Sequence, residues 1–307
     1  MRIKRKRIAF AVYGVLLSCA VFMCLYSHEL QLCAVDVLSV CASSVIPSLF
    51  PFMVISSMLT QLAPYLFGEK SKSLPLFGIP ACAVIPAMLG ALCGFPVGVV
   101  TVAGMKSRGL LTREQAEKVA AISNNTGPAF VIEVIGASFW GSRRIGVFLY
   151  LMQIASAFLL GAVMLVFSRK DTDVSGFSSV KHTAIRPAAV FSEAVGSSAL
   201  NVIRVCGFVV FFSVLVESVA LIFPGMPDTA RACISALLEF TSGCRLSSMI
   251  GTREALAVSA FSVGFGGVSV LCQGASFSSQ SGFSLRRTVI FKIFQGIFCA
   301  LFTYLLI

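Results

Sequence analysis

A long uncharged apolar segment near the N-terminus restricts the fold more than any other feature. Residues 8–26 are 19 consecutive positions without a charged side chain. As a helix they would extend about 28 Å, close to the thickness of a hydrocarbon core of about 30 Å. Similar apolar segments occur at 45–62, 145–168, 201–223 and 288–307. Because 57% of the residues are hydrophobic and only 12% are charged, the sequence predicts an all-α polytopic membrane protein.

The residues before the first apolar segment are strongly basic. Such a cluster followed by an apolar run also occurs in secretory signal peptides. Here the run is long for a signal peptide, and "YSHELQL" after it is a poor cleavage context. We therefore expect a retained first span with a cytoplasmic N-terminus. The basic cluster consists of Arg2, Lys4, Arg5, Lys6 and Arg7.

The formal net charge of +11 could indicate a nucleic-acid partner. The positive charges lie at the ends of apolar segments, however, where membrane topology and anionic headgroups account for them, and no nucleic-acid motif accompanies them. The eleven cysteines are scattered without a C-x-x-C pair, and the two histidines are His28 and His182. We expect no nucleic-acid partner, no metal and no other cofactor. Walker A, H-E-x-x-H and G-x-S-x-G motifs are absent, so we expect no enzymatic activity.

The order of apolar segments and polar breaks is repeated along the chain. The first half contains the breaks "GFPVG" (94–98) and "NNTGP" (124–128), and the second contains "EFTSG" (239–243) and "GFGGVSV" (264–270). Each half reads span, break, break, span, an order typical of transporters built from repeats. The predicted divisions are an N-terminal span with an amphipathic segment (1–44), a first repeat (45–168), a cytoplasmic connector (169–200) and a second repeat (201–307).

Counting spans from a cytoplasmic N-terminus predicts that the two halves begin on opposite sides, so they would have inverted topology with re-entrant hairpins and discontinuous helices. Several arginines then fall on or near the outer side, against the positive-inside tendency, unless some of them serve an anionic solute. These are Arg143, Arg144, Arg231, Arg245 and Arg253.

The segment 75–105 is apolar between two basic flanks and turns at "GFPVG". Two helical arms of about 10 to 18 residues reach about 15 to 27 Å, which is short of a full crossing for at least one arm. This favours a re-entrant hairpin with Gly94, Pro96 and Gly98 at its tip. The alternative is an ordinary span followed by a surface loop.

The "NNTGP" segment predicts a broken helix. Thr112 and Gln115 have capping-box spacing, so a helix should begin near residue 113, with Gly127 as a stop and Pro128 in the first turn of a second helix. The polar residues at such a break could merely satisfy the backbone or join neighbouring helices. Non-helical backbone at membrane depth also marks many substrate sites, and we favour a site here.

Acidic residues inside apolar segments are costly and therefore informative. Glu133 falls in the second half-helix and Glu217 near the end of a span, where both could lie at an interface. Glu239 lies beside Thr241, Ser242 and Arg245 at a predicted hairpin tip. It could bind a solute or couple protons, or it could pair with an arginine or cap a helix end.

Six segments resemble, in the same order, the sporulation integral membrane protein YlbJ family of the nucleoside-recognition Gate-domain group. They are "SLFPFMVISSML", "GFPVG", "EQAEKVAAISNNTGPAF", "GFVVFFSVL", "LEFTSG" and "FGGVSVLCQ". The resemblance covers residues 45–307 and implies a spore-forming bacterium and a protein of the outer forespore membrane. It further implies passage of dipicolinic acid, a flat pyridine dicarboxylate, toward the developing spore. Glu133 departs from the family pattern, in which a small or apolar residue is expected.

The resulting hypothesis is a transporter of a small anionic solute in the lipid bilayer, with half-helix N-termini at Pro128 and after Gly267 favouring the anion. Alternatives are a nucleoside or nucleobase carrier and a non-transporting assembly factor in spore formation. Homo-oligomers or contacts with other sporulation membrane proteins are compatible with each. The predicted substrate-binding residues, with Arg245 as the anion partner, are Gly94, Pro96, Gly98, Asn124, Asn125, Thr126, Gly127, Glu239, Thr241, Ser242, Arg245, Gly266, Gly267, Ser269 and Gln273.

Overall fold

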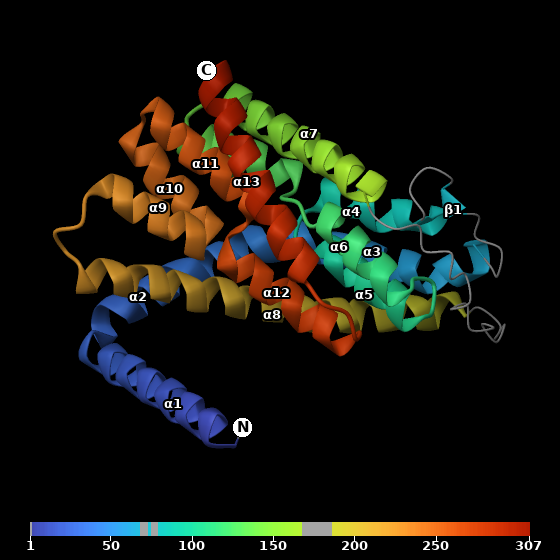
Figure 1. The fold of residues 1–307 in the computed structure, drawn as a ribbon, viewed down its shortest axis with the longest axis horizontal. Helices are drawn as coiled ribbons and strands as arrows, with labels where there is room; N and C mark the ends of the chain where they lie inside the picture. The colour runs from blue at the N-terminus through green and yellow to red at the C-terminus, as the bar shows by residue number, and fades with distance from the viewer. Residues whose placement is uncertain (1, 68–72, 75–78, 168–185) are drawn as a thin grey trace.

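The computed structural model describes residues 2–67, 73–74, 79–167 and 186–307 as an almost entirely helical chain (Figure 1). The predicted all-α class is confirmed. The N-terminal part comprises α1 (Arg2–Leu25), α2 (Ser27–Val40), the π-helical turn η1 (Cys41–Val45) and α3 (Ile46–Phe67). A short antiparallel pair of strands, β1 (Ser73–Leu74) and β2 (Ile79–Pro80), and the 3-10 turn η2 (Ala81–Ala83) lead into the first hairpin.

The predicted order of hairpins and broken helices is present in both halves. In the first half, the hairpin α4 (Val84–Cys93) and α5 (Val97–Ser107) precedes α6 (Arg113–Ser123), η3 (Phe130–Phe139) and α7 (Arg143–Phe167). In the second half, α8 (Pro187–Ile222) precedes the hairpin α9 (Asp228–Leu238) and α10 (Phe240–Ile250). The broken helix α11 (Arg253–Phe265) and α12 (Gly267–Gln280) follows, and α13 (Arg286–Leu306) ends the chain.

Length and apolar composition qualify four helical segments of the described residues to cross a membrane. They are Arg143–Met164, Pro187–Ile222, Arg253–Gln280 and Arg286–Leu306. Phe10–Leu25 and Ser27–Ser43 pass the same test together but are bent by 91° at their junction. The predicted first span is therefore helical, and the chain turns sharply after it. In Figure 1, α1 projects away from the bundle. The side chains of Phe10, Leu16 and Leu17 are exposed.

The long helix α8 begins earlier than the predicted second repeat. Residues 168–185, most of the expected connector, lie outside the described residues. Pro187 stands in the first turn of α8, a position that suits its fixed backbone angle and missing N–H. Residues 187–200 are thus part of a 36-residue helix rather than of a linker.

The packing between helices repeats when the two halves are exchanged. In each half the first part of the broken helix contacts both arms of its own hairpin: α6 contacts α4 and α5, and α11 contacts α9 and α10. Between halves, α12 packs against α5 and η3 packs against α10, while α13 contacts α6 and α7 contacts α11. In Figure 1 the hairpin α9–α10 lies on the left of the bundle and the hairpin α4–α5 lies to its right. These matching contacts support an internal repeat; the orientation of the halves across a membrane stays a prediction.

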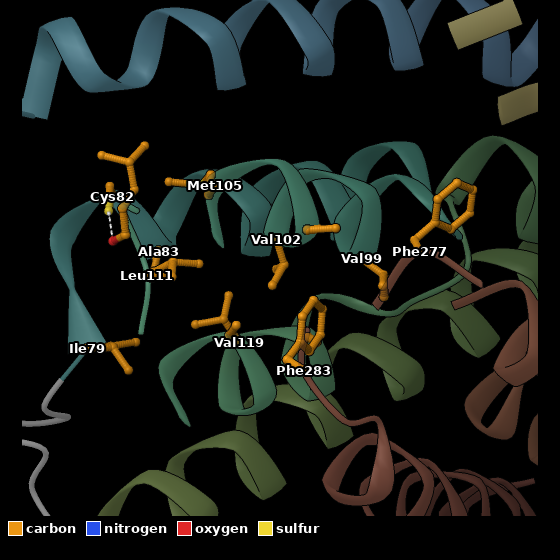
Figure 2. Close-up of a cluster of buried hydrophobic side chains, with 14 of the residues drawn as sticks. Ile79, Cys82, Ala83, Val99, Val102, Met105, Leu111, Val119, Phe277 and Phe283 are labelled. Carbon is orange, nitrogen blue, oxygen red and sulfur yellow. Dashed lines mark hydrogen bonds between the residues drawn. The ribbon is translucent and has the colours of Figure 1, made fainter. Parts of the chain in front are cut away.

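Each main apolar core joins side chains of both halves. One core packs Val99 and Val102 of the first hairpin and Val119 of α6 against Phe277 and Phe283 from the second half (Figure 2). A second core joins residues of η3 and α7 to residues of α10, α11 and α13, and a third joins residues of α3 and the first hairpin to residues of α8. Because these cores join the two halves, the four helix breaks lie where the halves meet.

Candidate functional site

The four helix breaks, far apart in the sequence, meet at one place. A Cβ atom on Gly94 would lie 2.4 Å from the backbone nitrogen of Gly127, so the first hairpin tip touches the "NNTGP" break. The Thr126 hydroxyl donates a hydrogen bond to the Val263 carbonyl of α11, at 3.2 Å. A Cβ on Gly267 would lie 3.1 Å from the Leu238 carbonyl oxygen, beside the second hairpin tip. We call these meeting segments, residues 94–96, 124–128, 239–240 and 266–267, the break cluster.

Phe95 connects three of the breaks. Its ring packs edge-on against Phe240 with ring centroids 5.4 Å apart. A Cβ on Gly266 would lie 3.0 Å from the Phe95 ring. Gly94 and Gly266 have φ angles of 81° and 85°, a region that side chains other than glycine rarely adopt. The glycines of the motifs thus serve both the backbone turns and the close approach of the tips.

The backbone of the "NNTGP" break is satisfied by side chains of α7 and α13. Gln153 of α7 donates to the Thr126 carbonyl at 3.1 Å. Gln295 of α13 donates to the Asn125 side-chain oxygen and to the Gln153 carbonyl, both at 3.0 Å. Lys292 donates to the Asn124 carbonyl at 2.7 Å. These contacts satisfy carbonyl groups that lipid could not.

Several polar atoms in and around the break cluster have no hydrogen-bond partner within the described part of the chain. Both side-chain atoms of Asn124, its Nδ2 and Oδ1, are unpartnered although Asn124 is only 1% exposed. The hydroxyls of Ser123 and Ser262 and the Oε1 atom of Gln153 are unpartnered as well. Buried polar groups are nearly always hydrogen-bonded in folded proteins, so such a concentration calls for an explanation. It is the arrangement that a polar ligand would complete.

Comparison with known proteins finds a relative. The sporulation integral membrane protein YlbJ of Bacillus subtilis (strain 168) is 26% identical to the chain over 301 residues, covering 85% of this chain and 74% of that protein. The similarity supports membership of the YlbJ family. No protein-family model matches the chain, and no solved structure matches it. The similarity to this integral membrane protein and the long apolar helices together support a multi-pass membrane protein.

The first-half residues predicted from the sequence all lie in or beside the break cluster. The structure brings Gly94 and Pro96 together with Asn124, Thr126 and Gly127, and Asn125 joins them through Gln295. Gly98 lies one step further along α5, where a Cβ would fall 2.0 Å from the Ser123 carbonyl oxygen. Thr112 and Gln115 form the predicted capping box, and α6 ends at Ser123, before the expected stop at Gly127.

The second-half residues are divided between the cluster and its surroundings. Glu239 is 2% exposed, and its carboxylate accepts hydrogen bonds from the backbone N–H groups of Thr241 (3.0 Å) and Ser242 (2.7 Å). It therefore caps α10, one of the roles expected for it from the sequence. Gly266 and Gly267 belong to the cluster. Ser269 and Gln273 are buried on α12 and bond each other at 3.4 Å.

Arg245 is not brought into the break cluster. Its side chain is 65% exposed and lies 3.9 Å from Asp36 of α2. Glu133 also lies at the surface, in an exposed ion pair with Arg143 at 3.0 Å. Glu217 pairs with Arg231 at 3.7 Å. Among the described residues, no group of three histidine, cysteine or acidic side chains could hold a metal ion.

Sequence reasoning did not single out Phe95, Gln153, Lys292 or Gln295. A repeated pattern could have shown the two glutamines, because "RRIGVFLYLMQ" of α7 and "RRTVIFKIFQ" of α13 each place a glutamine about two and a half turns after an arginine pair. Lys292 could have been found as a charge within an apolar span, which is by itself a functional signal.

Proposed function

We propose that the protein is a sporulation membrane transporter that carries a small anionic solute, dipicolinic acid, across the outer forespore membrane toward the developing spore. The observation that supports this best is the meeting of four helix breaks from both halves around unpartnered polar groups. In membrane transporters, discontinuous helices at a repeat interface hold the substrate. A membrane scaffold has no need of four breaks, since each one exposes backbone groups that must be satisfied inside the protein.

The chemistry of the cluster suits a small planar dicarboxylate. The N-terminus of η3 follows Gly127 and that of α12 begins at Gly267, so two half-helices start at the cluster. Helix N-termini present free N–H groups and a partial positive charge to an anion. The N-terminus of α10 does not contribute in the same way, because the Glu239 carboxylate already occupies it.

Transport requires that the cluster open to each side in turn, and the described conformation is closed. Asn124, Asn125 and Thr126 are each at most 2% exposed. The contacts that close the cluster are those between halves, where α12 lies on α5 and η3 lies on α10. Because these two contacts correspond under exchange of the halves, we propose that loosening one and then the other gives alternating exposure.

Uptake into proteoliposomes tests the proposal. Purified protein would be given radiolabelled dipicolinate or uridine, with the variants Asn124→Ala and Asn201→Ala. The Asn124 side chain makes no hydrogen bond in the closed state, so its loss should leave folding intact. Asn201 is a half-buried asparagine of α8 that is not one of the residues of the break cluster, and it serves as the matched control.

Each outcome has a distinct meaning. Saturable dipicolinate uptake that is lost in Asn124→Ala and kept in Asn201→Ala supports an anion transporter with its site at the breaks. Uridine uptake without dipicolinate uptake would move the assignment to nucleosides, whose base edges the Asn124 carboxamide could hydrogen-bond equally well. If intact, monodisperse protein takes up neither solute, the transport proposal fails and an assembly role becomes the better explanation.

A further inference from the structure

Lys292 places a positive charge at the centre of the break cluster. It lies in α13 and is 0% exposed. Its Nζ atom donates to the Asn124 carbonyl and to the Gln295 side-chain oxygen, each at 2.7 Å. It also lies 5.6 Å from the centroid of the Phe95 ring, within range of a cation–π contact. The ammonium thus contacts the first hairpin tip and the "NNTGP" break at once.

No acidic side chain of the described residues balances a positive charge on Lys292. None of the ion pairs among the described residues includes it. The amide and carbonyl oxygens around it are neutral, and a buried charge is costly unless it is paired. Buried lysines are usually paired with a carboxylate, as a second buried lysine shows: Lys118 of α6 is 1% exposed and lies 3.1 Å from the Glu114 carboxylate.

Satisfying the break does not require a charge at position 292. The neighbouring Thr126 carbonyl receives its hydrogen bond from Gln153, a neutral amide on the corresponding helix of the first half. A glutamine could serve the Asn124 carbonyl in the same manner. The ammonium therefore supplies something more than a hydrogen bond, and in an apolar surrounding that is an attraction for negative charge.

We propose that Lys292 is the cation that binds a carboxylate group of the transported solute, with the Asn124 side chain as a second donor. This inference rests on the proposed transport function and names the residue that selects an anion. In either orientation of its carboxamide, Asn124 offers an unused NH2 group beside the carbonyl that Lys292 contacts. Phe95, Phe240 and Phe130 form an aromatic chain next to these donors, with successive ring centroids 5.4 and 5.5 Å apart. The set fits an aromatic carboxylate, with its charged group on Lys292 and its ring among the phenylalanines.

The test separates charge from hydrogen bonding at position 292. Binding of pyridine-2,6-dicarboxylate and of its neutral diamide would be measured on the full-length protein in detergent. Lys292→Gln keeps a donor for the Asn124 carbonyl and removes the charge, whereas Lys292→Arg keeps the charge. Lys118→Gln is the matched control, because it removes a buried lysine that has its own carboxylate partner.

The wild-type protein is expected to prefer the dicarboxylate over the diamide. Lys292→Gln should lose about thirty-fold or more in affinity for the dicarboxylate, the effect of removing one partner of a buried charge pair. Its affinity for the diamide should change little, so the preference disappears. Lys292→Arg should retain the preference, and Lys118→Gln should bind as the wild-type protein does.

Two results would overturn the role of Lys292 and leave transport standing. One is a Lys292→Gln variant that still binds and takes up the dicarboxylate as the wild-type protein does. The other is an equal loss of affinity for both probes, because a purely structural lysine would affect them alike. If the wild-type protein neither binds nor takes up the dicarboxylate, the proposed function fails for this solute, and the assignment of Lys292 fails with it.

Discussion

Gly98 should be intolerant of even one added methyl group. A Cβ atom at this position would lie 2.0 Å from the carbonyl oxygen of Ser123, the last residue of α6. Reaching the shortest realistic separation, about 3 Å, requires the first hairpin and α6 to move apart by about 1 Å, and packed cores resist such movement. Overpacking costs typically about 1–3 kcal/mol, and a contact with backbone, which cannot rotate away, falls at the upper end. The gain in helix propensity from glycine to alanine offsets at most about 1 kcal/mol.

We therefore expect Gly98→Ala to be less stable than the wild-type protein by about 2 kcal/mol. Gly207→Ala on α8 is the matched control, because nothing lies within 4 Å of its added Cβ; it should be neutral or more stable by up to about 1 kcal/mol. Thermal unfolding of the purified proteins in detergent measures both. Since Ser123 precedes Asn124, Gly98→Ala should also reduce dipicolinate uptake. A Gly98→Ala variant as stable as Gly207→Ala would refute the close packing of the hairpin against α6.

Three further substitutions test charged groups around the bundle by the same unfolding measurement. Glu239→Ala removes the cap of α10 and should cost about 1–2 kcal/mol; an unchanged midpoint would contradict the capping role. Glu114→Gln removes a counter-charge of buried Lys118 and should lower stability by about 1–3 kcal/mol, less than for a fully buried pair because Glu114 is partly exposed. In a Lys118→Met background, where the buried positive charge is absent, Glu114→Gln should lower stability by less. Glu133→Ala, which breaks the exposed pair with Arg143, should change stability by less than about 1 kcal/mol, and a larger loss would show that this pair is not a simple surface contact.

Local signals in the sequence located the breaks, because each break is built from residues with special backbone chemistry. Gly94 and Gly266 take positive φ angles, and Thr112 forms its capping box with Gln115 as the spacing predicts. Partners across the molecule carry no such local signal. The contact of Lys292 with Asn124 joins residues 168 positions apart, and only the packing of α13 against α6 brings them together.

The expectation for Arg245 shows how a local argument can point to the wrong face of a helix. Arg245 follows Glu239 by six residues, which on a helix of 3.6 residues per turn is about 600°, or a third of a turn away from the same face. Its side chain accordingly reaches the surface near Asp36 and not the interior. A charge in the cluster had to come from an element that faces it directly, and Lys292 on α13 meets that requirement.

The internal repeat makes the asymmetry of that charge informative. Gln153 and Gln295 occupy matching places on α7 and α13, both fully buried and both bonded to the "NNTGP" break. Three residues before each of them stand Tyr150 in the first half and Lys292 in the second. The Tyr150 hydroxyl donates to the Ala91 carbonyl of the first hairpin at 3.1 Å, so it fastens the hairpin without introducing charge. Two halves that share a framework thus differ where they face the cluster. Under the proposed binding mode, a solute with one carboxylate at Lys292 would therefore have a single preferred orientation.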